Sequence, residues 1–310
     1  MSDLSVLYDA PGPRAKTRNI LYTVLFVVVM ALVVWWVLAI MADKGQLAGE
    51  KWLPFVEDSR VWTTFILPGL LNTLKAAALA ILIALPFGVL LGVGRLSDHR
   101  WVRAPAGAVV EFFRAIPVLL LMLFANQAYA QFSDIDPETR PLFAVVTGLV
   151  LYNASVIAEV VRAGVLSLPY GQTDAAKAIG MRKGQTMSYV LLPQAVTVML
   201  PALVSQLVVI VKDTALGGAM LGFPELLSRV QSITANYGAN TIAAFTVVAL
   251  IFVLVNFALT SVAHRLESRA RRSRKGTGAV IGEDPGSDVA VPVIPEQPTG
   301  DGAAVKKGAD

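Results

Sequence analysis

Residues 20–41 read ILYTVLFVVVMALVVWWVLAIM, an apolar run without a charged side chain. A helix needs about 20 consecutive apolar residues to cross the hydrocarbon core of a bilayer, and this run is long enough. Further apolar runs follow it, and charged residues make up only 15% of the 310-residue chain. A soluble domain carries about a quarter of such residues. The sequence therefore predicts an all-α, polytopic membrane protein.

Six transmembrane helices are expected along the chain. The first is read as a true span rather than a signal peptide, because no small-residue cleavage pattern follows it. Pro193 and Pro201 interrupt a longer apolar stretch, and proline ends or kinks a helix, so a boundary is expected near them with an interfacial segment at 186–199. The six spans are predicted at about residues 20–41, 65–94, 116–131, 142–161, 202–221 and 242–263.

Lys and Arg residues cluster in alternate connections between these spans. They precede the first span, separate the second from the third and the fourth from the fifth, and follow the sixth. Cytoplasmic loops carry the excess of Lys and Arg, so both termini are expected in the cytoplasm of a cell whose plasma membrane holds the protein. The same bias explains the net charge of +4 without a nucleic-acid partner. Residues 1–19 would form a cytoplasmic N-terminal segment and residues 270–310, rich in Gly, Pro and Asp, a disordered cytoplasmic tail.

A polar segment, SLPYGQTDAAKAIG at residues 167–180, lies between two apolar runs on the predicted cytoplasmic side. Thr173 is expected to cap the start of a short helix, with Asp174 in its first turn to complement the helix dipole. Gly180 is expected to end it in the left-handed conformation. These features leave two roles open, namely an amphipathic connector on the membrane surface and a helix that enters a cleft in a partner. Three small residues keep the helix slim: Ala175, Ala176 and Ala178.

Residues 171–180, GQTDAAKAIG, together with YVLLPQA at 189–195, resemble the signature loop of ABC importer permeases. The resemblance is greatest to the polar amino-acid uptake group, which takes histidine, glutamate, arginine and glutamine. It covers about residues 65–264. Asp174 stands where the family usually has Glu, and Ala115-Ile116 stand in place of Gly-Thr. Four further segments match the group in order: Asn72-Thr-Leu74, Phe113-Arg-Ala-Ile-Pro117, Glu159-Val-Val-Arg-Ala-Gly164 and Val211-Lys-Asp-Thr-Ala-Leu216.

The resemblance implies a type I ABC importer permease fold, with five core spans in residues 65–264 and one extra N-terminal helix. It also implies an ATP-driven importer of polar amino acids, glutamate foremost, that moves substrate from an extracellular binding protein to the cytoplasm by alternating access. The permease would pair with a second permease subunit, identical or different. Two cytoplasmic ATPase subunits would dock on a coupling helix at about 172–182. The implied docking residues are Gly171, Gln172, Asp174, Ala175, Ala176 and Gly180.

The sequence contains no Gly-x-x-x-x-Gly-Lys-Ser/Thr loop for nucleotide phosphates. The chain is therefore expected to be no enzyme and to hold no cofactor or metal, with ATP and Mg²⁺ bound by partner subunits. Two other functional classes stay open. An ion-coupled secondary transporter would need no ATPase, and a non-transporting membrane scaffold or sensor would need no polar pathway.

Polar side chains inside the predicted spans are candidates for the substrate pathway. A charged side chain at the centre of a bilayer costs about 2.5–3.5 kcal/mol on insertion scales, so each calls for a reason. The alternatives are a structural ion pair, a hydrogen bond to a neighbouring helix, and a long side chain that reaches lipid phosphate. The candidates are Arg114, Asn153, Ser155, Glu159, Lys212, Asp213 and Thr214.

Overall fold

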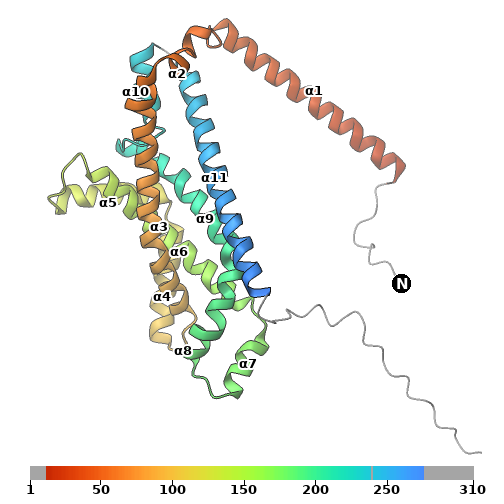
Figure 1. The fold of residues 1–310 in the computed structure, drawn as a ribbon, viewed down its shortest axis with the longest axis vertical. Helices are drawn as coiled ribbons and strands as arrows, with labels where there is room; N and C mark the ends of the chain where they lie inside the picture. The colour runs from red at the N-terminus through yellow and green to blue at the C-terminus, as the bar shows by residue number, and fades with distance from the viewer. Residues whose placement is uncertain (1–11, 239, 276–310) are drawn as a thin grey trace, which may run out of the picture. The chain divides into compact units, whose positions relative to one another are not determined.

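The computed structural model describes residues 12–238 and 240–275, which are helical and contain no strand (Figure 1). The predicted all-α class is confirmed. The chain consists of two units that meet after Ser268, and the described residues of the second unit are the end of one helix. The long helices are α1 (Pro13–Asp43), α3 (Leu67–Arg95), α4 (Arg100–Ala115), α5 (Val118–Phe132), α6 (Arg140–Leu166), α9 (Leu192–Leu221) and α11 (Thr241–Lys275). The short ones are α2 (Pro54–Glu57), α7 (Tyr170–Ala178), α8 (Lys183–Gln185) and α10 (Arg229–Tyr237), with π-helical turns at Val61–Ile66 and Thr186–Leu191.

Five helical segments of the described part are long and apolar enough to cross a membrane, and a sixth is available if α4 and α5 count as one bent span. The predicted third span is thus only the shorter half of a pair that bends by 99°. Pro117 causes the bend, because the residue before a proline is pushed out of the helical region, and Ile116 has φ −92° and ψ 129°. The amphipathic helix α4 occupies residues expected to form a loop.

The boundary expected near Pro193 and Pro201 is wrong. Lys183–Leu221 is one helical segment of 39 residues that passes through both prolines. Pro193 directly follows the π-helical turn Thr186–Leu191, as the second residue of α9. Pro201 lies inside α9, and a helix in lipid tolerates it because a full break would expose several more backbone groups to hydrocarbon.

Helices α3 and α6 form the closest packed pair of the bundle and lie side by side (Figure 1). A stripe of small residues on α3, one every fourth position, is buried against α6: Ala76, Ala80, Ala84, Gly88 and Gly92. A Cβ at position 88 would lie 2.6 Å from the Cβ of Ile157, so only glycine permits this approach. Small residues let helix backbones come close together in a membrane, where packing rather than hydrophobicity drives association.

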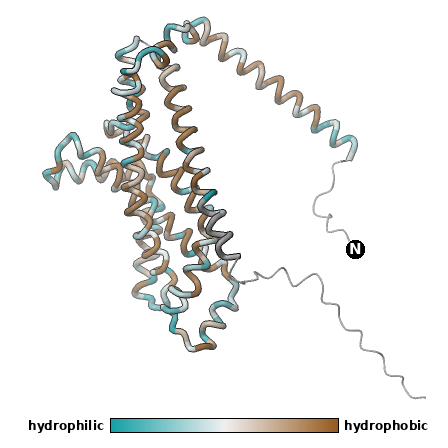
Figure 2. The backbone as a smooth tube through the Cα atoms, in the orientation of Figure 1, coloured by the Kyte–Doolittle hydropathy of each residue, from teal (hydrophilic) through white to brown (hydrophobic). Residues whose placement is uncertain are grey.

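The outermost helices differ in how they are packed. Helix α11 packs against the core through Ala243, Ala244 and Val248. Helix α1 has no buried residue and is apolar over most of its length, as Figure 2 shows. A helix that is hydrophobic all round suits a lipid environment. Helix α11 continues to Lys275 and so includes the first residues of the predicted tail, whereas residues 1–11 and 276–310 lie outside the described ranges.

Candidate functional site: a charged cluster, a buried polar pair and an exposed helix

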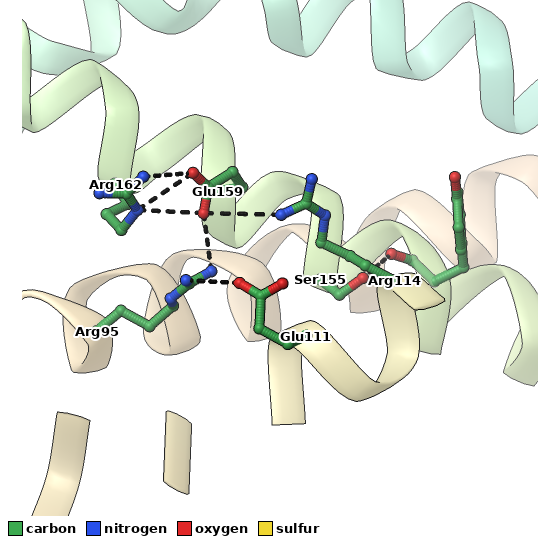
Figure 3. A network of polar contacts seen from close by, with 7 residues as sticks. Arg95, Glu111, Arg114, Ser155, Glu159 and Arg162 are labelled. Carbon is green, nitrogen blue, oxygen red and sulfur yellow. Dashed lines mark hydrogen bonds and ion pairs between the residues drawn. The ribbon is translucent and has the colours of Figure 1, made fainter. Parts of the chain in front are cut away.

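A cluster of five charged residues joins the ends of α3, α4 and α6 (Figure 3). The carboxylate of Glu159 on α6 accepts hydrogen bonds from Arg95 Nη1 at 2.8 Å and from Arg162 Nη2 at 2.6 Å. Arg114 Nη1 of α4 lies 3.9 Å from the same carboxylate. Arg95 donates a second bond, of 2.8 Å, to Glu111 of α4. Glu159 is therefore the centre of the cluster.

The cluster carries three arginines and two glutamates, which leaves one positive charge in excess. The side chains of Arg95 and Glu159 are 15% and 26% exposed, so their ion pair is partly shielded from water. Charges attract each other more strongly at a partly buried site than in bulk water. These ion pairs hold the ends of α3, α4 and α6 together, and the three ends are free to separate when the pairs break.

The sequence predicted Arg114 and Glu159 as site residues, and the structure brings them together with Arg162 of the Glu159-Val-Val-Arg-Ala-Gly164 segment. It adds Arg95 and Glu111, which were not predicted: Arg95 was expected in a loop, and Glu111 was expected at the entrance of the third span. The missing signal was the amphipathic pattern of α4, which places Glu111 and Arg114 three residues apart on one helix.

The polar residues predicted in the middle of α6 and α9 are buried within the chain. The Ser155 hydroxyl donates to the Tyr152 carbonyl at 2.6 Å, and the Thr214 hydroxyl donates to the Val211 carbonyl at 2.7 Å. Both groups are therefore satisfied inside their own helices and not by the neighbouring helix that the alternative reading expected for Ser155. Asn153 instead accepts a hydrogen bond from the side-chain amide of Gln206 and so links α6 to α9. Gln206 was not among the predicted candidates, because its partner lies 53 residues away in the sequence.

Lys212 and Asp213 are neighbours on α9 and form no ion pair with each other among the described residues; Lys212 is exposed and Asp213 is half-buried. Lys212 stands nine residues before the end of α9, which is about 14 Å along the helix axis. Ionisable residues within a membrane face a bundle interior or a water-filled cavity rather than lipid. This side of α9 is therefore a candidate wall of the pathway.

The polar segment forms α7, and its start differs from the prediction. The helix begins at Tyr170 after Pro169, whose φ of −56° already suits a helix. Thr173 lies inside the helix and does not cap it, and Asp174 is not in the first turn. The predicted end is confirmed, because Gly180 has φ +80°. Two backbone bonds complete a Schellman motif there, Gly180 N–H to the Lys177 carbonyl at 2.9 Å and Met181 N–H to the Ala176 carbonyl at 3.0 Å.

The two sides of α7 have different surroundings. Ala176 is only 4% exposed and packs α7 onto the bundle. A cavity of about 330 Å³ lies behind the helix, lined in part by Thr173, Lys177 and Met187. The other five predicted docking residues are exposed: Gly171, Gln172, Asp174, Ala175 and Gly180. Large apolar side chains are exposed at the same end, namely Tyr170, Ile179 and Tyr189. Polar residues with exposed apolar groups among them suit a protein partner.

Residues 84–272 match the model of one protein family, the binding-protein-dependent transport system inner membrane component. The chain belongs to this family. It is a multi-pass membrane protein and a permease by family, with spans that agree with the expected ABC importer permease fold. Within the described residues, no group of three or more His, Cys, Asp or Glu is placed to hold a metal ion.

Three relatives show how far the similarity extends. The glutamate transport system permease protein GluD of Corynebacterium glutamicum is 48% identical over 248 residues, covering 79% of this chain and 89% of the relative. The inner membrane amino-acid ABC transporter permease protein YhdY of Escherichia coli is 30% identical over 82% of this chain, which spans 65% of that longer protein. The crystal structure of an amino acid ABC transporter with histidines matches with a TM-score of 0.60 at 27% identity. The match covers 70% of this chain and 98% of the chain in that structure.

Proposed function

We propose that the chain is the permease subunit of an ATP-driven importer for polar amino acids, with glutamate as the leading substrate. The observation that carries the proposal is the 48% identity to a glutamate transport permease over 79% of this chain. The excess positive charge of the Glu159 cluster supports it, because an arginine-rich lining favours an anionic substrate. Family membership argues against the ion-coupled transporter and the scaffold as alternatives.

The exposed face of α7 is the proposed docking site for two cytoplasmic ATPase subunits, which would bind ATP and Mg²⁺. This places α7 and the charged cluster on the cytoplasmic side, with both termini of the chain inside. A second permease subunit and an extracellular substrate-binding protein would complete the importer. The transport domain would occupy residues 65–264, with α1 as an additional helix outside it.

Substrate would pass along the face of α9 that exposes Lys212 and would leave past the charged cluster. Arg114 is suited to contact it there, because its guanidinium has only one distant partner in the cluster and is 38% exposed. Glu159 would close the inner end of the pathway while its pairs with Arg95 and Arg162 are intact. The buried Asn153–Gln206 pair would hold α6 and α9 together between these two points.

Uptake of labelled amino acids tests the proposal. A strain that lacks this gene is supplied with glutamate, glutamine, arginine or histidine, each with and without the restored gene. The expected result is restored, ATP-dependent uptake of glutamate above the other three. Restored uptake of another polar amino acid would correct the substrate, and uptake that persists when the ATPase subunit is deleted would refute the ATP-driven mechanism.

A further inference from the structure

The segment between α9 and α10, residues 222–228, leaves the helical conformation and yet is largely buried. Phe223 is 3% exposed, and Glu225 and Leu226 are 0% exposed. Its contacts on the second span, Asn72 and Thr73, lie 11 and 12 residues after the start of the helical segment Val61–Arg95, which is about 17 Å along the axis. A buried backbone that is not helical needs protein groups to satisfy its hydrogen bonds.

Two residues of α3 bind the backbone of this segment directly. The side-chain amide of Asn72 donates to the Pro224 carbonyl at 2.9 Å. The hydroxyl of Thr73, itself 1% exposed, accepts the N–H of Leu226 at 3.1 Å. These two residues open the Asn-Thr-Leu segment of the sequence, for which neither the charged cluster nor the docking helix gives a use.

The side chain of Glu225 satisfies the next two backbone groups. Its Oε2 accepts the N–H of Leu227 at 2.7 Å, and its Oε1 accepts the N–H of Ser228 at 2.6 Å. The Ser228 hydroxyl returns a bond of 2.7 Å to the Glu225 carbonyl. With the bonds from Glu225 N–H to the Phe223 carbonyl and from Phe223 N–H to the Gly217 carbonyl, each N–H from residue 223 to 228 has a partner. Pro224 has no backbone N–H and needs no partner there.

Glycines on both neighbouring helices give this segment its space. A Cβ at Gly218 of α9 would lie 1.9 Å from Glu225 Oε1. A Cβ at Gly69 of α3 would lie 3.0 Å from the Leu226 Cα and 3.3 Å from the Glu225 carbonyl oxygen. The segment is thus fitted between α3 and α9, with one glycine on each side.

We propose that Asn72, Thr73 and Glu225 are positioning residues of transport: they clamp the 222–228 segment between α3 and α9 so that both helices move as one body when the importer switches. The proposal rests on the proposed function, which places this segment toward the extracellular side. During alternating access, the extracellular end of the pathway must close as the cytoplasmic end opens. If the hydrogen bonds that clamp the segment break, α3 and α9 no longer move together, and ATP is hydrolysed without moving substrate.

The test measures the number of ATP molecules hydrolysed per glutamate taken up by the complete importer in proteoliposomes. Thr73→Val keeps the shape of the side chain and removes the acceptor for Leu226 N–H, and Thr73→Ser restores the acceptor. Thr63→Val is the matched control, because Thr63 is exposed and its hydroxyl bonds within its own helical segment. We expect Thr73→Val to raise the ratio at least threefold, while Thr73→Ser and Thr63→Val keep the wild-type ratio.

A merely structural role would lower uptake and ATP hydrolysis in proportion, so an unchanged ratio in Thr73→Val overturns the proposal. If that variant does not fold, Asn72→Leu tests the same clamp at a half-buried position that makes one bond to it. An unchanged ratio there overturns the proposal equally. A wild-type importer that takes up no polar amino acid would instead refute the proposed function.

Discussion

Replacing Glu159 by Gln should weaken the charged cluster far more than replacing Glu111 by Gln. Glu159 meets Arg95 at 2.8 Å and Arg162 at 2.6 Å, and its side chain is 26% exposed. Glu111 makes one contact, with Arg95, and its side chain is 62% exposed. Both substitutions keep the shape of the side chain and remove one negative charge. The difference between them therefore isolates the position of the charge.

The size of the effect follows from the number and exposure of the contacts. A hydrogen bond to a charged group contributes about 1.5–3 kcal/mol, and Glu159 makes such bonds to two arginines. Partial exposure lowers this gain, and the glutamine keeps one acceptor oxygen, so we expect the free energy of unfolding to fall by about 2–4 kcal/mol for Glu159→Gln. For the exposed Glu111 pair we expect a loss below about 1 kcal/mol.

Thermal unfolding of the purified protein in detergent measures the loss of stability, and uptake measures its consequence. Glu159→Gln should unfold at a temperature several degrees lower, and in the proposed importer it should leak substrate because the ion pairs proposed to close the inner end of the pathway are weakened. A double-mutant cycle with Arg162→Gln should show that the two losses do not add. Equal destabilisation by Glu111→Gln and Glu159→Gln would refute the central position of Glu159.

Three further predictions concern packing, docking and pH. Gly88→Ala should destabilise the protein by about 1–3 kcal/mol through overpacking. Gly107→Ala is the control and should stabilise the protein slightly, because position 107 is helical and the added Cβ meets nothing within 4 Å. Equal unfolding temperatures of the two variants would contradict this prediction. Ala175→Arg, on the exposed face of α7, should leave membrane insertion intact and abolish both uptake and co-purification of the ATPase. Burial raises the pKa of Glu225 from 4.5 to about 7, while hydrogen bonds from the backbone N–H groups of Leu227 and Ser228 and the charge of Arg229 act in the opposite direction. The folded state then holds a proton that the unfolded state releases, so stability should fall by about 3 kcal/mol as the pH rises from 4.5 to 7 and should lose this dependence in Glu225→Gln.

Local chemistry of the sequence was enough to predict most of the long apolar helices and one of the two ends of α7, but not α4. Apolar runs gave the spans because the bilayer demands a minimum length, and Gly180 ended α7 because few residues other than glycine adopt its positive φ. The errors arose where two local rules compete. Thr173 is a good cap, but Pro169 starts the helix earlier, and Pro201 breaks helices in water but is tolerated in lipid.

Long-range partners could not be predicted from one sequence. Arg95 and Glu159 are 64 residues apart, and Asn72 and Pro224 are 152 apart, so nothing in either neighbourhood indicates the other. Glu225 is a clear example, because a glutamate in a polar connection is usually solvated, whereas here two glycines on other helices bury it. The residues that position the site are therefore the ones that required the structure.

The contacts of α7 connect the proposed docking site with both sets of polar residues. Arg162 lies four residues before the end of α6 at Leu166, and α7 starts at Tyr170, so α7 lies close to the cluster along the chain. On its other side α7 packs on the π-helical turn that leads into α9, and Gln172 accepts a hydrogen bond from Gln194. Helix α7 is thus connected to α6 through the chain and to α9 through packing, and α6 and α9 are joined by the hydrogen bond between Gln206 and Asn153. In the proposed importer, a movement of α6 transmitted by α7 would have to break the ion pair between Glu159 and Arg95 of α3, so neutralising this carboxylate should loosen that contact without any change at α7.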